Sequence, residues 1–104
     1  MIAVTVKENN INSGIELCFG KSEYFFVFDI KTKKYSFIKN SCKELQNNSG
    51  KKAVMLLKKL GVKTVFSSNF GVLVKKLFDK YKVQMVILSP QIKYLNDIEW
   101  IKNK

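Results

Sequence analysis

Segments with helical periodicity alternate with short, β-branched segments in the second half of the chain, and this alternation limits the fold more than any other feature. In the first helical segment, apolar residues recur at i, i+3, i+4 and i+7, on Ala53, Leu56, Leu57 and Leu60. Ser49 is a typical N-cap for this helix and Gly61 a typical C-terminal stop. Helices that connect neighbouring strands make those strands parallel and the crossover right-handed.

The remaining segments complete an α/β pattern. Apolar or alternating residues predict strands over residues 2–6, 24–30, 35–38, 62–66 and 83–88. The turn at 31–33 makes the second and third strands a hairpin. A second helix carries Leu73, Val74, Leu77, Phe78 and Tyr81 on one side. Ser89 and Pro90 predict the start of a last helix with Ile92, Leu95, Ile98 and Ile101. The expected order is βββαβαβα in one domain over residues 1–104.

Strand direction predicts where the loops gather. If the first, fourth and fifth strands are parallel and the hairpin pairs with the first, the second strand is antiparallel and the third runs forwards. The loops after strands one, three, four and five then emerge at one edge of the sheet, where open α/β sheets bind ligands. We expect this edge to collect Cys18, Cys42, Asn69 and Gly71. Gly71 opens a helix, whose free N–H groups favour an anion.

The charge is strongly positive and carried by lysine alone. The chain of 104 residues has 19 basic and 8 acidic residues, a formal charge of +11, and no arginine. Proteins that read bases or phosphates rely on the arginine fork, which lysine does not reproduce. The lysines are also scattered, so we favour a solvated surface over a nucleic-acid interface. An anionic ligand or an acidic partner is compatible with this charge.

The residue types exclude several chemistries. There is no histidine and there are two cysteines, so neither a Ser-His-Asp nor a Cys-His nucleophile can be built, and a Cys/His zinc site is excluded. The strand at 2–6 has no carboxylate, which argues against two-metal hydrolysis. We expect no export signal, because Met1 leads directly into the first strand without a basic region or cleavage site, and no apolar run is long enough for a membrane span. We therefore expect a cytoplasmic protein with reduced thiols that is not an enzyme.

The order of motifs resembles the dinitrogenase iron-molybdenum cofactor biosynthesis family, which includes NifX-like proteins and the C-terminal domain of NifB-like proteins. The resemblance rests on a serine-containing first loop that ends in Phe19-Gly20-Lys21, on the aromatic hairpin, on the helix ending in Leu60-Gly61-Val62, and on the small-residue loop ending in Gly71. It covers almost the whole chain. It implies a ribonuclease-H-like three-layer fold with a mixed five-stranded sheet of order 3-2-1-4-5, and binding of iron-sulfur or iron-molybdenum cluster species without catalysis.

The sequence departs from this family at three places. Many members have histidine before Phe-Gly, where this chain has Cys18. A thiolate also suits iron or a sulfide cluster. Ser67-Ser68 stands where a glycine pair is usual, and Ser89-Pro90 replaces a glycine-rich stretch.

Each candidate has a structural alternative. Cys18 and Cys42 are candidate metal and cluster ligands, or small apolar residues under loops. The further candidates for cofactor binding are Phe19, Gly20, Asn69 and Gly71. The alternatives for these four are a hydrophobic plug, a turn glycine and helix capping.

Two function hypotheses follow. In the first, the protein carries an anionic iron-sulfur or iron-molybdenum cluster, or a precursor, near Cys18, and exchanges it with cluster-assembly or acceptor proteins. In the second, it is a metal-free interaction or regulatory module that uses its lysine-rich surface on acidic proteins or nucleic acid. The oligomeric state stays open.

Overall fold

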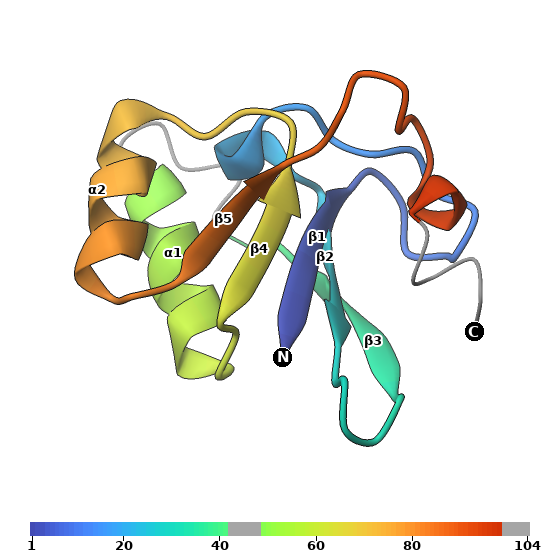
Figure 1. Ribbon diagram of the computed structural model, residues 1–104, viewed down its shortest axis with the longest axis horizontal. Helices are drawn as coiled ribbons and strands as arrows, with labels where there is room; N and C mark the ends of the chain where they lie inside the picture. The colour runs from blue at the N-terminus through green and yellow to red at the C-terminus, as the bar shows by residue number, and fades with distance from the viewer. Residues whose placement is uncertain (42–48, 99–104) are drawn as a thin grey trace.

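A five-stranded sheet forms the middle layer of the protein in the computed structural model (Figure 1), which describes residues 1–41 and 49–98. The strands are β1 (Ile2–Val6), β2 (Tyr24–Phe28), β3 (Tyr35–Lys39), β4 (Thr64–Ser67) and β5 (Gln84–Ile87). Their order is β3-β2-β1-β4-β5. β1 pairs antiparallel with β2 and parallel with β4, while β5 pairs parallel with β4. The predicted strand order and the antiparallel second strand are both confirmed.

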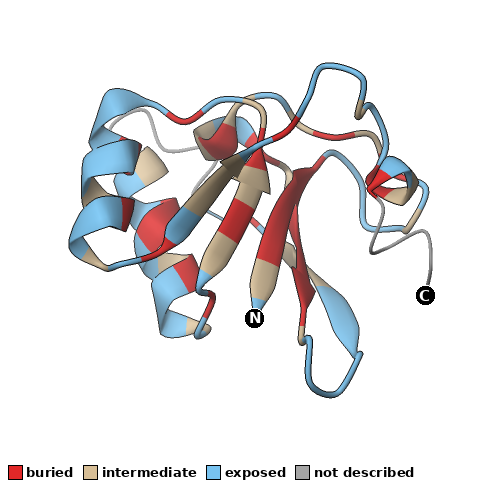
Figure 2. Cartoon of the chain, viewed as in Figure 1, coloured by how far each residue is buried: buried red, intermediate tan, exposed pale blue. Residues whose placement is uncertain are grey.

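Two helices, α1 (Ser49–Lys59) and α2 (Val72–Lys80), cover one face of the sheet (Figure 1). Their apolar sides pack on strand residues that include Ala3, Phe25 and Val65, all fully buried. Figure 2 shows the burial concentrated in the sheet and on the inner sides of both helices. As predicted, α1 stops at a glycine: Gly61 has a φ of +84°, which favours a residue without a side chain.

The predicted last helix is wrong over the described residues 89–98. This segment is a loop with only a short 3-10 helix, η2 (Leu95–Asp97). Its backbone pairs instead with the first loop, because Ile15 N–H donates to Lys93 O and Leu95 N–H donates to Ser13 O, each at 2.9 Å. The main chain is extended at Tyr94, between these two bonds, and the Leu95 N–H that an α-helix would bond to the carbonyl four residues earlier is bonded to Ser13 instead. Ile101 lies outside the described residues.

The apolar residues of that loop still cover the sheet. Leu88, Leu95 and Ile98 are buried against the face of the sheet opposite the helices, together with the strand residues Val4 and Phe26. The helical spacing of the apolar residues therefore predicts correctly which side chains are buried, but it predicts the wrong backbone conformation. The first loop and the segment after β5 form the third layer, on the right of Figure 1.

β2 ends at Phe28, two residues earlier than predicted, because Asp29 turns the chain. The Asp29 carboxylate accepts hydrogen bonds from the N–H groups of Lys31 at 2.9 Å and Thr32 at 3.4 Å. These bonds favour the ionised carboxylate and lower the pKa of Asp29 below its usual value. The hairpin follows with Lys33 at a φ of 65°, and Ile30 is left exposed.

Within residues 1–41 and 49–98, no helix has the length and apolar character needed to cross a membrane.

Candidate functional site

The loops that follow β1 and β4 meet at the carboxyl edge of the sheet. Cys18 and Asn69 form an isolated parallel bridge, and the Phe19 N–H donates to the Asn69 carbonyl at 3.1 Å. The predicted meeting of these two loops is confirmed. The loop after β5 joins them, since Pro90 lines a pocket together with Leu17 and Ser68. Cys42, expected at the same edge, lies outside the described residues.

A buried pair of hydroxyl groups ties the first loop to the sheet below it. The Thr5 and Ser67 hydroxyls share a hydrogen bond of 2.8 Å between β1 and β4. The Thr5 hydroxyl also donates to the Glu16 carbonyl at 2.8 Å, and the Glu16 N–H donates to the Thr5 carbonyl at 3.0 Å. Because Thr5 and Ser67 are both fully buried, the bond between their hydroxyls has no competition from water. The position of the loop before Cys18 is therefore fixed by the sheet.

The start of the same loop is organised by a buried serine. The Ser13 hydroxyl oxygen accepts hydrogen bonds from the N–H groups of Lys7 at 3.1 Å and Glu8 at 2.8 Å. The Lys7 N–H also donates to the Gly14 carbonyl at 3.1 Å. The Ser13 side chain therefore satisfies main-chain N–H groups that have no partner in a helix or strand, and it stabilises this polar loop.

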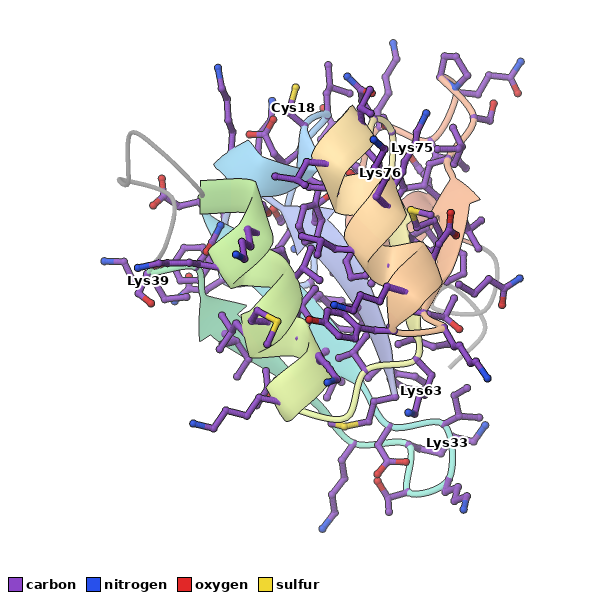
Figure 3. The ribbon with its side chains drawn as sticks, turned by 90° about the vertical axis from the view of Figure 1, so that its left-hand side faces the viewer. Cys18, Lys33, Lys39, Lys63, Lys75 and Lys76 are labelled. Atoms are coloured by element: carbon purple, nitrogen blue, oxygen red, sulfur yellow. The ribbon has the colours of Figure 1, made fainter. Side chains whose placement is uncertain are left out.

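Cys18 is a half-buried free thiol at the entrance to a short 3-10 helix, η1 (Phe19–Lys21). Its N–H donates to a carboxylate oxygen of Glu16 at 3.3 Å. Figure 3 shows Cys18 at the same end of the molecule as the start of α2, whose first turns carry Lys75 and Lys76. The thiol is thus reachable from solvent at the edge where the strands end.

Phe19 lies in the core. It is 1% exposed, and its ring centroid is 5.2 Å from Phe78, 5.5 Å from Phe25 and 5.8 Å from Phe70. This burial favours the plug interpretation over contact with a ligand. Because Phe19 follows Cys18 directly, its packing also holds the thiol in place. Gly20 is half-buried within η1.

Asn69 and Gly71 lie at the start of α2, but they contribute differently. The carbonyl of Asn69 is bonded to Phe19, and its side chain is exposed. Gly71 is the N-cap of α2, with a φ of −65° and no side-chain cap bond, and a Cβ placed there would meet nothing within 4 Å. Gly71 thus leaves the N-terminus of α2 without a capping side chain, and a helix N-terminus suits an anion.

Among the described residues, no group of three or more Cys, Asp or Glu side chains converges as a metal site. Cys18 is thus the one soft donor that the described part of this edge supplies. A single thiolate can attach a preformed cluster but cannot enclose a bare metal ion, which needs about four ligands.

The sequence predicts the loop after β5 at this edge but assigns the residues that follow Pro90 to a helix. In the structure, Lys93 and Tyr94 lie in the loop instead and line the pocket beside Leu17. The pairing of Lys93 with Ile15 depends on contacts between segments far apart in the chain. No local pattern encodes such a contact, so we find no signal in the sequence that could have revealed it.

Comparison with known proteins places the fold among solved structures. The apo form of the orange protein from Desulfovibrio gigas superposes with a TM-score of 0.85 and 17% identity, covering 98% of this chain and 86% of that one. A NifB-like protein of the DUF35 family from Thermotoga superposes with a TM-score of 0.79 and 19% identity, covering 92% of this chain and 80% of that one. At these identities the likeness shows the fold alone.

A search of curated proteins finds no significant match. The family model described as dinitrogenase iron-molybdenum cofactor, by contrast, matches residues 1–96. This match spans every strand of the sheet and both helices, and it includes the bridge between Cys18 and Asn69. The chain therefore belongs to the dinitrogenase iron-molybdenum cofactor family.

Proposed function

We propose that the protein is a non-catalytic carrier of an anionic iron-sulfur or iron-molybdenum cluster, or of a precursor, which it binds at the edge formed by Cys18, Asn69 and Gly71. Family membership supports the cofactor class. The observation that carries the proposal is the bridge between Cys18 and Asn69, which sets a half-buried thiol beside the loop that opens α2.

Three interactions would hold the cluster. The Cys18 thiolate supplies a soft donor to iron, and the N–H groups at the start of α2, after Gly71, face negatively charged sulfide. The exposed amines of Lys75 and Lys76 add a positive field at this end of the molecule (Figure 3). Cys42 is proposed as a second donor. Phe19 and Gly20 then serve as the support that positions Cys18, not as contacts.

One donor, or at most two, leaves most of the cluster surface uncovered, and this suits a cargo that must leave again. A carrier with this property would pass its cluster to assembly or acceptor proteins, which complete the coordination with their own ligands. Two-metal hydrolases of this fold usually have a carboxylate on the first strand. β1 carries none, so metal-dependent hydrolysis is not supported. The proposed role is therefore binding and transfer.

Anaerobic reconstitution with ferrous iron and sulfide tests the proposal. We expect the wild-type protein to retain iron and sulfide through desalting and to show a visible absorbance band. Cys18→Ser should lose most of both signals, whereas Cys42→Ser, the matched thiol control, should lose a smaller part. A colourless wild-type protein without retained metal contradicts the proposal.

The same variants test the metal-free alternative. An interaction module that uses the lysine surface would bind acidic proteins or nucleic acid with a steep salt dependence. Its binding would be indifferent to both Cys→Ser changes. That result, with no metal retained, would favour the alternative.

A further inference from the structure

A pocket of about 480 Å³ opens beside the bridge between Cys18 and Asn69. Leu17 and Ser68, which directly precede the two bridge residues, both line it. Its other walls come from the first loop and from the segment after β5. The volume lies within the range of about 300–1,000 Å³ that small-molecule sites occupy.

The walls of the pocket are mainly aliphatic. Ile15, Leu17, Pro90 and Ile92 line it, and Tyr94 adds an aromatic ring. Two of these side chains are left in solvent: Leu17 is 59% exposed and Tyr94 is 55% exposed. A ligand with an apolar body would cover these side chains and remove their apolar surface from water, which favours binding.

The charge at the pocket has one sign. Lys7 and Lys93 line it from the two opposing segments, and no acidic residue does. Asp97, on the same segment as Lys93, has its carboxylate bonded to the N–H groups of Lys93 at 3.2 Å and Tyr94 at 3.0 Å. That carboxylate is thus bonded to the main chain, and both charged residues of the pocket lining, Lys7 and Lys93, are basic.

The pocket is also built before any ligand arrives. Main-chain hydrogen bonds of 2.9 Å join Ile15 to Lys93 and Leu95 to Ser13, so the two lysine-bearing segments are fixed relative to each other. A preformed site avoids much of the ordering cost of binding. No cysteine or carboxylate lines the pocket, which leaves it without metal ligands of those types.

We propose that this pocket binds a small organic anion, whose apolar body lies on Ile15, Leu17 and Ile92 and whose carboxylate, sulfonate or phosphate group lies between Lys7 and Lys93. The proposal is independent of cluster binding, since it needs neither thiol nor metal. A failure of the reconstitution experiment leaves it intact, and its own failure says nothing against a cluster at Cys18.

Titration of the metal-free protein with the fluorescent probe 8-anilinonaphthalene-1-sulfonate tests it, with the neutral N-phenyl-1-naphthylamine as the uncharged counterpart. We expect one molecule of the sulfonate to bind. Exposed charge pairs are worth about 0.2–1 kcal/mol each. The double variant Lys7→Gln with Lys93→Gln should therefore weaken the affinity for the sulfonate about twofold to thirtyfold. The same double variant should bind the neutral probe with an affinity within about twofold of the wild type.

A charge-matched control is Lys59→Gln with Lys63→Gln, near the opposite end of the molecule, where Figure 3 labels Lys63. It removes the same net charge and should leave the affinity for the sulfonate unchanged. Equal weakening by both double variants would assign binding to the overall positive field and overturn the proposal.

A second variant blocks the pocket without changing charge. A Cβ at Gly14 would lie 3.6 Å from Lys7 Cδ and 3.8 Å from the Lys93 carbonyl oxygen, in ordinary contact, and the φ of Gly14 is not positive. Gly14→Leu should therefore fold, extend into the pocket and abolish binding of both probes. Gln84→Leu, which adds a leucine at an exposed position at the start of β5 and outside the pocket lining, is the matched control. Retained binding in a folded Gly14→Leu protein, or amide shifts on addition of probe that avoid Leu17 and Ile92, would overturn the proposal.

Discussion

Replacement of Phe19 by alanine separates its packing role from a ligand role. The ring is 1% exposed and contacts three other buried rings. Truncation of a buried phenylalanine to alanine costs about 3–5 kcal/mol, because burial is lost and a cavity remains. A domain of this size has a free energy of unfolding of about 5–15 kcal/mol, so the change removes a large part of it.

Urea unfolding followed by far-UV circular dichroism measures this loss. With a slope of about 2 kcal/mol/M, a loss of 4 kcal/mol lowers the midpoint by about 2 M. Cys18→Ala, one residue away and half-buried, is the matched control, and we expect it to change the free energy by about 0.5 kcal/mol or less. If Phe19→Ala costs less than about 1 kcal/mol at an unchanged slope, the reasoning that Phe19 is a core residue fails.

Two further predictions concern the hydrogen bonds that shape the loops. Thr5→Val leaves the buried Ser67 hydroxyl without its partner and should lower the free energy of unfolding in urea by about 1–3 kcal/mol. The double variant Thr5→Val with Ser67→Ala should lose much less than the sum of the two single losses. Strictly additive losses would show that the two hydroxyls do not interact. Asp29→Ala removes the acceptor of the Lys31 N–H and should lower the melting temperature at pH 7. Because folding lowers the pKa of Asp29, its stabilisation is present above the unfolded value of about 3.9 and is lost as the pH falls through the folded value, so the difference should be smaller at pH 2 than at pH 7. A difference in melting temperature that is the same at both pH values would contradict this assignment.

The sheet could be predicted because its evidence is local. β1 alternates β-branched residues, β2 is almost continuously aromatic, and the helix before Gly61 has a clear apolar side and a clear stop. From these segments, the crossover rule yields strand direction and places the loops of Cys18 and Asn69 at one edge. The structure has both features.

The last segment could not be predicted for a physical reason. Ile92, Leu95 and Ile98 are spaced as on a helix, but the main chain of Lys93 and Leu95 bonds to the first loop, which begins more than eighty residues earlier. Periodicity records which side chains are buried and says nothing of which N–H and C=O groups find partners elsewhere. The same contact creates the pocket, so the error about this helix and the missed pocket have one cause.

The pairing of residues 13–15 with 93–95 has a consequence for biosynthesis. Because the pocket has one wall from near the start of the chain and another from near its end, a polypeptide emerging from the ribosome cannot present it until Tyr94 has been made and has docked. The pocket is therefore absent from any partly folded state in which these two segments have not yet paired.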